Sequence, residues 1–363
     1  MTGGGIFMDD TLYERLAEAL DHLPNGFPRT SSGIEIEILR IVFLPDEAEI
    51  ACALSDDWES ADQIAVRLGA DAQETEDRLR LMSDKALVCR DVRDGSTVFR
   101  LGRFIVGIWE AAVWRLDGEI AHRFAHLTEE YLAETGGLAG IMTPAPAIHR
   151  VVPSRGAAKS EWILPYDDVR TFLDGAKSFV LRDCVCRKQQ DLLGRRRCTF
   201  TRRACLSFSP MERPKGPDSI SREEALAALD EFEKMGLVHT VSNVAKGISY
   251  VCNCCGCCCE MLRGITDFGL KDSIAYANYY CAVDSATCSG CRICETRCQM
   301  RAMTVKDGIA SIDRERCIGC GLCVTGCSTG AAHLRLKPAD QVVAPPADIG
   351  DWSRLRKAAR GLS

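Results

Sequence analysis

The sequence lacks the marks of a membrane protein and of a secreted protein. Its longest apolar stretch, Phe104 to Trp114, contains Glu110 and is much shorter than the roughly 20 residues that span a bilayer. The N-terminal residues MTGGGIFMDD have no basic segment ahead of an apolar one, as a signal peptide would. We therefore expect a cytoplasmic protein without a membrane span, whose thiols stay reduced and can bind metals.

Nucleotide-binding signatures are also missing. The glycine-rich N-terminus has no strand and helix around it, and no GxxxxGK[ST] loop occurs. The 45 basic and 51 acidic residues leave a formal net charge of −6, which argues against a chain built as a whole to coat nucleic acid or anionic membrane. With 46% hydrophobic residues the composition is globular, and 363 residues predict two to three domains at about 150 residues each.

Cysteine is plentiful but unevenly distributed. Of 21 cysteines, only Cys52 and Cys89 precede position 184, and the other 19 lie between 184 and 327. A secreted disulfide scaffold is short and spreads its cysteines throughout the chain. The clustering therefore favours metal binding.

The N-terminal third has a helical pattern that ends in a hairpin. A first helix at about 10–23 and a linker fill residues 1–33, and the apolar spacing from Ile34 is again helical. Helices follow at 60–69 and 71–85, and then strands at 86–89 and 97–101, joined by Asp94-Gly95. This order resembles a winged helix-turn-helix domain over residues 34–103. A long helix from Phe104 to about Glu134 is predicted to complete this domain, 34–140.

The resemblance implies a DNA-recognition helix at 71–80, but the charges there have the wrong sign. Its first turns carry Asp71, Glu74, Glu76 and Asp77, which would face phosphates and base edges. Arginines of the hairpin alternate with Asp91 and Asp94. We therefore expect no tight DNA binding, and a protein-docking or structural use of this domain.

The middle region, 141–283, is predicted to be a cysteine-rich α/β region. A helix at Tyr166–Gly175, a strand at Phe179–Val185, a capped helix at Ser221–Gly236 and a strand at Leu237–Val241 are expected. The candidate metal ligands are Cys184, Cys186, Cys198, Cys205, Cys252, Cys254, Cys255, Cys257, Cys258 and Cys259, with Cys281 just before the next domain.

The number of these cysteines exceeds what one cluster can use. A cubane has four corners, so either two centres share the cysteines or one cluster lies beside a free redox-active pair. We predict a third metal centre, an Fe–S cluster or else zinc, with ligands from both segments, because the 221–236 helix can fold the chain back. The rival is a pair of local sites. Arg195, Arg196, Arg197, Arg202 and Arg203 either serve the site, by docking a partner or lowering thiol pKa values, or form a solvated loop.

The C-terminal cysteines form an internal duplication. Two sets have the spacing C-x-x-C-x-x-C-x-x-x-C, with a constant offset between their members: Cys288, Cys291, Cys294 and Cys298, and then Cys317, Cys320, Cys323 and Cys327. Over 285–335 the chain resembles bacterial-type ferredoxins with two [4Fe–4S] clusters. The C-x-C pair and the C-N-C-C-x-C-C run ahead of it are similar to those of ferredoxin-fused iron–sulfur proteins of anaerobic microbes.

The ferredoxin resemblance implies the ligands of each cluster. One cluster is assigned to Cys288, Cys291, Cys294 and Cys327, and the other to Cys317, Cys320, Cys323 and Cys298. The proline that usually follows the fourth cysteine is Gln299 in one half and Ser328 in the other, which is expected to loosen the turn. Two zinc sites are the alternative, and the doubled spacing disfavours them.

The expected fold class is therefore a multidomain α+β protein. It has the winged-helix-like domain, the cysteine-rich middle region, a dicluster domain at 284–337 and a tail at 338–363. The expected function is electron transfer with redox protein partners. The alternatives are a redox-sensing transcriptional regulator, and a reductase with a catalytic Fe–S centre within 184–259.

Overall fold

The computed structural model describes residues 5–134, 136–158, 163–164 and 166–362. Backbone contacts divide the chain into two compact units. Unit 1 comprises Met1–Pro144 and Arg356–Ser363, and unit 2 comprises Ala145–Leu355. None of the helices in the described ranges has both the length and the apolarity that a membrane crossing requires.

Unit 1 is mainly helical and carries one small antiparallel sheet. Its elements are α1 (Gly5–Asp21), α2 (Ile34–Val42), α3 (Pro45–Cys52), β1 (Glu59–Ser60), α4 (Ala61–Leu68), α5 (Ala72–Asp84), β2 (Val88–Arg93) and β3 (Ser96–Leu101), followed by the helices up to α8. The strand order is β1-β3-β2. Asp94 and Gly95 both have positive φ (50° and 79°), as a two-residue hairpin turn of the mirror-image type requires.

The long helix predicted from Phe104 to about Glu134 is wrong, because the chain breaks it twice. The elements are η1 (Phe104–Ile108), α6 (Trp109–Arg115), α7 (Gly118–Ala133) and α8 (Gly137–Met142). Backbone angles at 105–107 are not helical, and Asp117 is extended ahead of Gly118, whose φ is 54°. A glycine in the left-handed region turns the chain here at little steric cost.

Unit 2 is built on one six-stranded sheet with the order β4-β8-β9-β6-β5-β7. Its elements before the C-terminal module are β4 (His149–Val152), η3 (Thr171–Leu173), β5 (Ser178–Asp183), α9 (Val185–Leu192), β6 (Arg203–Ser209), β7 (Ser219–Ile220), α10 (Arg222–Met235), β8 (Val238–Ser242), β9 (Tyr250–Cys254), α11 (Glu260–Thr266) and η4 (Lys271–Ser273). All pairings are antiparallel, so the region is α+β and the expected α/β architecture is wrong. The helix expected at 166–175 is a single short turn, η3, in the described part of that segment.

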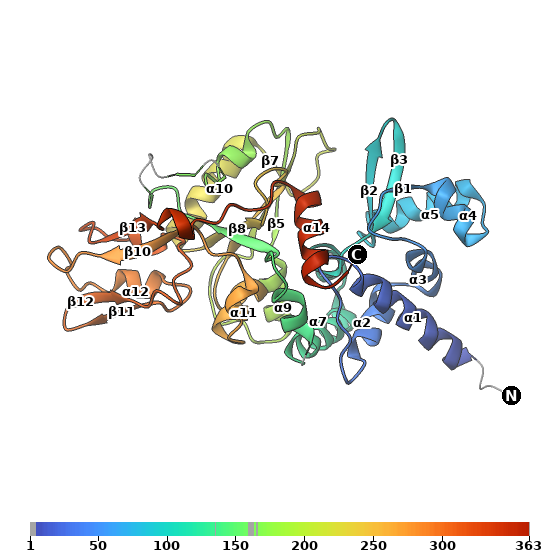
Figure 1. Ribbon diagram of the computed structural model, residues 1–363, viewed down its shortest axis with the longest axis horizontal. Helices are drawn as coiled ribbons and strands as arrows, with labels where there is room; N and C mark the ends of the chain where they lie inside the picture. The colour runs from blue at the N-terminus through green and yellow to red at the C-terminus, as the bar shows by residue number, and fades with distance from the viewer. Residues whose placement is uncertain (1–4, 135, 159–162, 165, 363) are drawn as a thin grey trace. The chain divides into compact units, whose positions relative to one another are not determined.

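Helices cover both faces of this sheet. On one face Ala225 and Leu229 of α10 pack on Leu206, Val241 and Val251 of the strands. The capping box at Ser221 and the left-handed Gly236, both expected from sequence, begin and end α10. Helices α9 and α11 lie on the opposite side of the sheet from α10 (Figure 1). Val251 of β9 points into the core that α10 covers. Because side chains alternate along a strand, Cys252 and Cys254 lie on the opposite face of the sheet.

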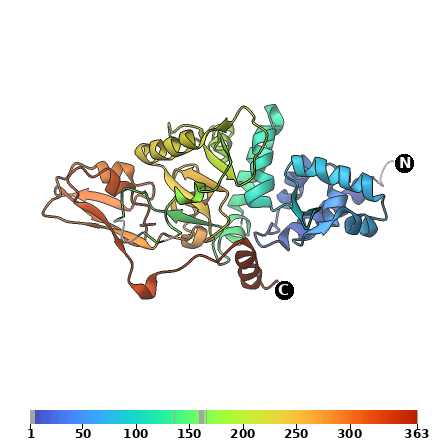
Figure 2. The ribbon, with the colours of Figure 1, turned by 90° about the horizontal axis from the view of Figure 1, so that it is seen from above.

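The C-terminal module, residues 279–336, consists of two antiparallel strand pairs and two short helices at one end of unit 2 (Figure 1). Its elements are β10 (Tyr279–Val283), α12 (Ile293–Arg297), β11 (Met303–Lys306), β12 (Ile309–Ile312), α13 (Leu322–Thr325) and β13 (Ala332–Leu336). Strand β10 pairs with β13, and β11 with β12. After the module the chain runs back along unit 2 through η5 (Ala339–Gln341) to α14 (Ile349–Ala359) (Figure 2).

Candidate metal centres

Two small cavities in the C-terminal module are lined by cysteines. Four thiol residues surround the first cavity: Cys288, Cys291, Cys294 and Cys327. The second is lined by Cys298, Cys317, Cys320, Cys323 and also Cys281. Each of these groupings contains one ligand set that the ferredoxin resemblance implies, including the exchange of the fourth cysteine between the halves.

Backbone amides around these cavities donate hydrogen bonds to cysteine sulfurs. Amide N–H groups of Ala310, Ala302 and Ala332 donate to the sulfurs of Cys288 (3.4 Å), Cys298 (3.2 Å) and Cys327 (3.4 Å). Such donors stabilise thiolates, and hydrogen bonds to cluster sulfurs tune the reduction potential. The donor set and the cavities therefore fit [4Fe–4S] clusters.

Close backbone packing explains the glycines of the ligand loops. Gly290 has φ of 67°, and a Cβ there would lie 2.5 Å from the carbonyl oxygen of Gly308. Gly319 has φ of 75°, and a Cβ there would lie 2.3 Å from the carbonyl oxygen of Tyr279. Both positions combine a left-handed backbone with a contact that only glycine permits.

Cys281 belongs to the second cavity and not to the middle region with which its sequence position grouped it. It lies on β10, and its hydrogen bond to the Cys323 thiol raises the pKa of that thiol. Nearby, the Tyr276 hydroxyl is buried without a hydrogen-bond partner among the described residues, and Cys317 is close enough to perturb it electrostatically. An orphaned donor beside this candidate ligand would suit a cluster sulfide acceptor.

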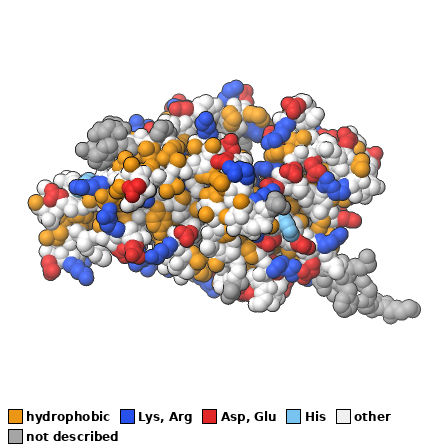
Figure 3. Space-filling view, viewed as in Figure 1, with side chains coloured by type: hydrophobic (Ala, Val, Ile, Leu, Met, Phe, Trp, Pro, Cys, Tyr) orange, Lys and Arg blue, Asp and Glu red, His pale blue; other side chains and the backbone are white. Residues whose placement is uncertain are grey.

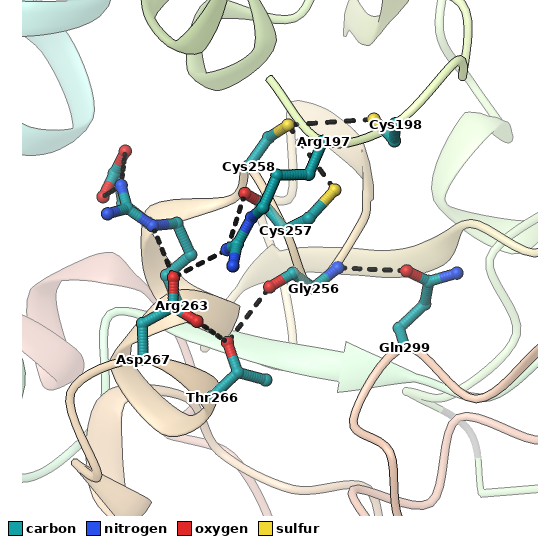
Figure 4. A network of polar contacts seen from close by, with 10 residues as sticks. Arg197, Cys198, Gly256, Cys257, Cys258, Arg263, Thr266, Asp267 and Gln299 are labelled. Atoms are coloured by element: carbon teal, nitrogen blue, oxygen red, sulfur yellow. Dashed lines mark hydrogen bonds and ion pairs between the residues drawn. The ribbon is translucent and has the colours of Figure 1, made fainter. Parts of the chain in front are cut away.

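A second kind of site lies in the middle region, where four thiols form a compact tetrahedral group: Cys198, Cys255, Cys257 and Cys258. All four sulfurs lie within 4.8 Å of one another. The sulfur–sulfur distance is 3.9 Å for Cys198–Cys255. It is 3.8 Å for Cys198–Cys258 and 3.6 Å for Cys257–Cys258 (Figure 4). Metal–sulfur bonds of about 2.3 Å in a tetrahedron give edges of about 3.8 Å. The tetrahedral group therefore has the size of a site for one metal ion.

Polar contacts hold the loop that carries three of these thiols. The Arg197 guanidinium donates to the carbonyl of Cys257 (3.3 Å) and to Asp267 (2.8 Å), and the Thr266 hydroxyl donates to the carbonyl of Gly256 (3.0 Å), as Figure 4 shows. Hydrogen bonds from Cys255 and the other two thiols lower the pKa of the Cys198 thiol well below its ordinary value. A thiolate at neutral pH is the form that binds metals.

Several arginines of the arginine-rich segment are tied to neighbouring elements of unit 2. Arg196 and Arg202 each form an ion pair with Asp191 (3.1 Å), and Arg203 donates to the carbonyl of Leu181 (3.1 Å). The Arg202 and Arg203 side chains remain about half exposed.

Gln299 connects the C-terminal module to the tetrahedral group. Its carboxamide oxygen accepts the N–H of Gly256 (3.1 Å) (Figure 4). Its amide nitrogen donates to the carbonyl of Gly236 (2.9 Å). Gly256 separates Cys255 from Cys257, and Gln299 follows Cys298. The glutamine at the position of the usual proline therefore fastens the turn after Cys298 to the middle region, whereas the sequence suggested only a looser turn.

The other cysteines of the middle region gather on the opposite side of β9. Cys184 is the N-cap residue of α9, and Cys186 lies in its first turn. The sequence predicted that the C-x-C pair ends a strand, but the pair lies at the junction between β5 and α9. Hydrogen bonds link four thiols, which we call the four-thiol ring: Cys184 to Cys186, Cys186 to Cys259, and Cys259 to Cys254. Cys184 is also near enough to Cys254 to act on it electrostatically. Hydrogen bonds from Cys252 and Cys259 lower the pKa of Cys254 to about 5.

A buried arginine lies between the tetrahedral group and the four-thiol ring. Arg187 is fully buried and donates to the carbonyls of Thr201 (3.1 Å) and Asn253 (2.9 Å). Its guanidinium also hydrogen-bonds Cys255 and is close to Cys184, and these thiols raise its pKa. One buried cation thus balances thiolate charge in both groups.

Comparisons with known proteins identify one domain. The family model of a 4Fe-4S binding domain matches residues 309–332, which include Cys317, Cys320, Cys323 and Cys327. No curated protein and no solved structure matches the chain. Together with the cysteine groups, the domain match indicates an iron–sulfur protein.

Proposed function

We propose that this protein transfers electrons through two [4Fe–4S] clusters in the C-terminal module and one iron ion in the tetrahedral group. The contact between Gln299 and Gly256 carries this proposal. It places the backbone next to a ligand of the second cluster, Cys298, against the backbone between two ligands of the tetrahedral group. Because the ligand segments of the two sites touch at this contact, we infer that electrons pass between the sites there.

The sulfur geometry favours a single ion in the tetrahedral group. The cysteines of a cubane bind four different irons, so their sulfurs lie farther apart than the ligands of one ion. Iron and zinc both accept four thiolates in a tetrahedron. Only iron changes its oxidation state there, so electron transfer through this group requires iron.

Metal analysis of anaerobically purified full-length protein tests the proposal. We expect about eight cluster irons with matching sulfide, from two four-iron clusters, and further iron in the tetrahedral group. Cys291→Ala should remove about four irons, and Cys198→Ser should remove about one iron without loss of sulfide. Cys89→Ser, in unit 1, is the matched control and should change neither count. Zinc in the tetrahedral group would refute its electron-transfer role, and a C-terminal module without iron would refute the whole proposal.

We also propose that unit 1 is a docking or structural module and not a DNA reader. The order of α3, β1, α4, α5, β2 and β3 matches the winged-helix pattern, but the arginines of α5 are engaged. Arg78 forms an ion pair with Asp46, and Arg80 with Glu76. Basic and acidic side chains alternate over the visible face of this unit (Figure 3). A protein that binds DNA releases counterions by placing basic side chains against the phosphates. The ion pairs of Arg78 and Arg80 oppose this, so we expect weak DNA binding.

A further inference from the structure

Two cysteines of the middle region belong neither to the tetrahedral group nor to the four-thiol ring. They lie opposite each other on neighbouring strands of the sheet. Cys205 on β6 and Cys252 on β9 are register partners in an antiparallel pair. The Phe208 N–H donates to the carbonyl of Ser249 in the same ladder (2.8 Å). Since hydrogen-bonded and non-hydrogen-bonded pairs alternate along antiparallel strands, Cys205 and Cys252 form a non-hydrogen-bonded pair.

This register suits a disulfide bond. The Cα atoms of a non-hydrogen-bonded pair lie about 4.5 Å apart, with the side chains close on the same face. Disulfides occur at Cα separations of about 4.4–6.8 Å. The Cys205 thiol is also the largest cause of the raised pKa of Cys252, as expected for two neighbouring sulfurs. A sulfur–sulfur bond can therefore form with little movement of the backbone.

The pair also touches the four-thiol ring. Cys252 hydrogen-bonds Cys254 as well as Cys205, and Cys254 and Cys252 share one face of β9. Cys254 is buried, whereas Cys205 and Cys252 are each half-buried. In the same cross-strand row the side chain of Arg182, the partner of Cys205 on β5, is half exposed. The pair thus lies between a buried thiol group and the more open side of the sheet.

We propose that Cys205 and Cys252 form a redox-active dithiol that reduces disulfides. One thiolate attacks a substrate disulfide, forming a mixed disulfide and releasing the first substrate thiol. The second thiolate then displaces the other substrate thiol, and the Cys205–Cys252 bond forms. Two electrons and two protons convert this bond back to two thiols. The electrons come singly from the iron–sulfur centres, and this return step rests on the proposed function, whereas formation of the disulfide does not.

The test traps the pair in anaerobic full-length holoprotein. One sample is treated with glutathione disulfide and a second with dithionite, and both are unfolded in excess iodoacetamide without reductant. Mass spectrometry of the peptides and iron analysis follow. In the oxidised sample we expect a linked peptide that joins Cys205 to Cys252, a loss of two free thiols per chain, and unchanged iron. In the dithionite sample the link should be absent, and both cysteines should be alkylated.

Two variants separate a redox pair from a pair of metal ligands. In Cys205→Ser, no linked peptide can form, so Cys252 should be recovered alkylated or in a mixed disulfide with glutathione, and the iron content should equal that of the unaltered protein. Cys89→Ser is the control, because Cys89 lies on an antiparallel strand opposite Arg100 and has no thiol across from it. Failure of the linked peptide to form in the unaltered protein would overturn the proposal. So would loss of iron on oxidation or in Cys205→Ser, because either would make these cysteines ligands. Iron analysis tests the electron-transfer proposal separately.

Discussion

Replacement of Gly256 by alanine tests the contact on which the proposed electron path depends. A Cβ at this position would lie 2.1 Å from the carbonyl oxygen of Gln299, a backbone atom that cannot rotate away. The two segments must therefore separate, which strains the turn between Cys255 and Cys257. Overpacking of this kind costs about 1–3 kcal/mol. Gly216→Ala is the matched control, because a Cβ there meets nothing within 4 Å.

Anaerobic urea unfolding measures this effect, because the midpoint reports the free energy of unfolding. A loss of about 2 kcal/mol, divided by a slope of about 2–3 kcal/mol per molar urea, lowers the midpoint by about 0.7–1 M. Gly256→Ala should also release metal from the tetrahedral group before the cluster irons, since its ligand loop is displaced. The control should shift the midpoint by less than about a third of that amount. Equal midpoints for the two variants would show that the contact between the module and the middle region does not exist.

Three further predictions follow from buried or paired charges. Burial lowers the pKa of His149 to about 4 from 6.5, so its neutral form contributes stability above pH 6.5 that is lost as pH falls toward 4. In urea unfolding, His149→Gln should remove about 2 kcal/mol of the stability difference between about pH 8 and pH 5; an unchanged difference would contradict this. Arg187→Met should cost about 3–5 kcal/mol and loosen metal binding in the middle region, because it leaves thiolates without their buried counter-charge; unaltered unfolding and metal content would count against it. The full-length protein should show no nanomolar binding to the promoter region of its own gene, and salt-sensitive binding of that strength in a gel-shift assay would favour a regulator instead.

Sequence predicts best those features whose causes are local. The helix at 61–68 follows from a serine and a glutamine that cap its first turn, and α10 follows from Ser221 and Gly236 in the same way. The hairpin at Asp94-Gly95 needs only two residues that tolerate positive φ. In each case the stabilising contacts lie within one turn of the chain.

The features that sequence misses depend on distant partners. Cys281 joins the second cluster cavity because β10 pairs with β13, a pairing between segments some 50 residues apart. The role of Gln299 depends on its hydrogen bonds to the backbone of Gly256 and Gly236, which belong to another part of unit 2. Local sequence patterns do not predict contacts between such distant segments. The duplicated spacing concerns the cysteines alone and gives no information about the residue after Cys298.

The run from Cys252 to Cys259 shows how a strand separates neighbouring ligands. Successive side chains of a strand point to opposite faces, so Cys252 and Cys254 face the side of α9 and α11, whereas Cys255 faces the other side. There Cys255 packs with Phe232 of α10. The following turn through Gly256 then brings Cys257 and Cys258 to Cys198. Six cysteines in eight residues therefore do not make one crowded site. They form a boundary between two thiol groups.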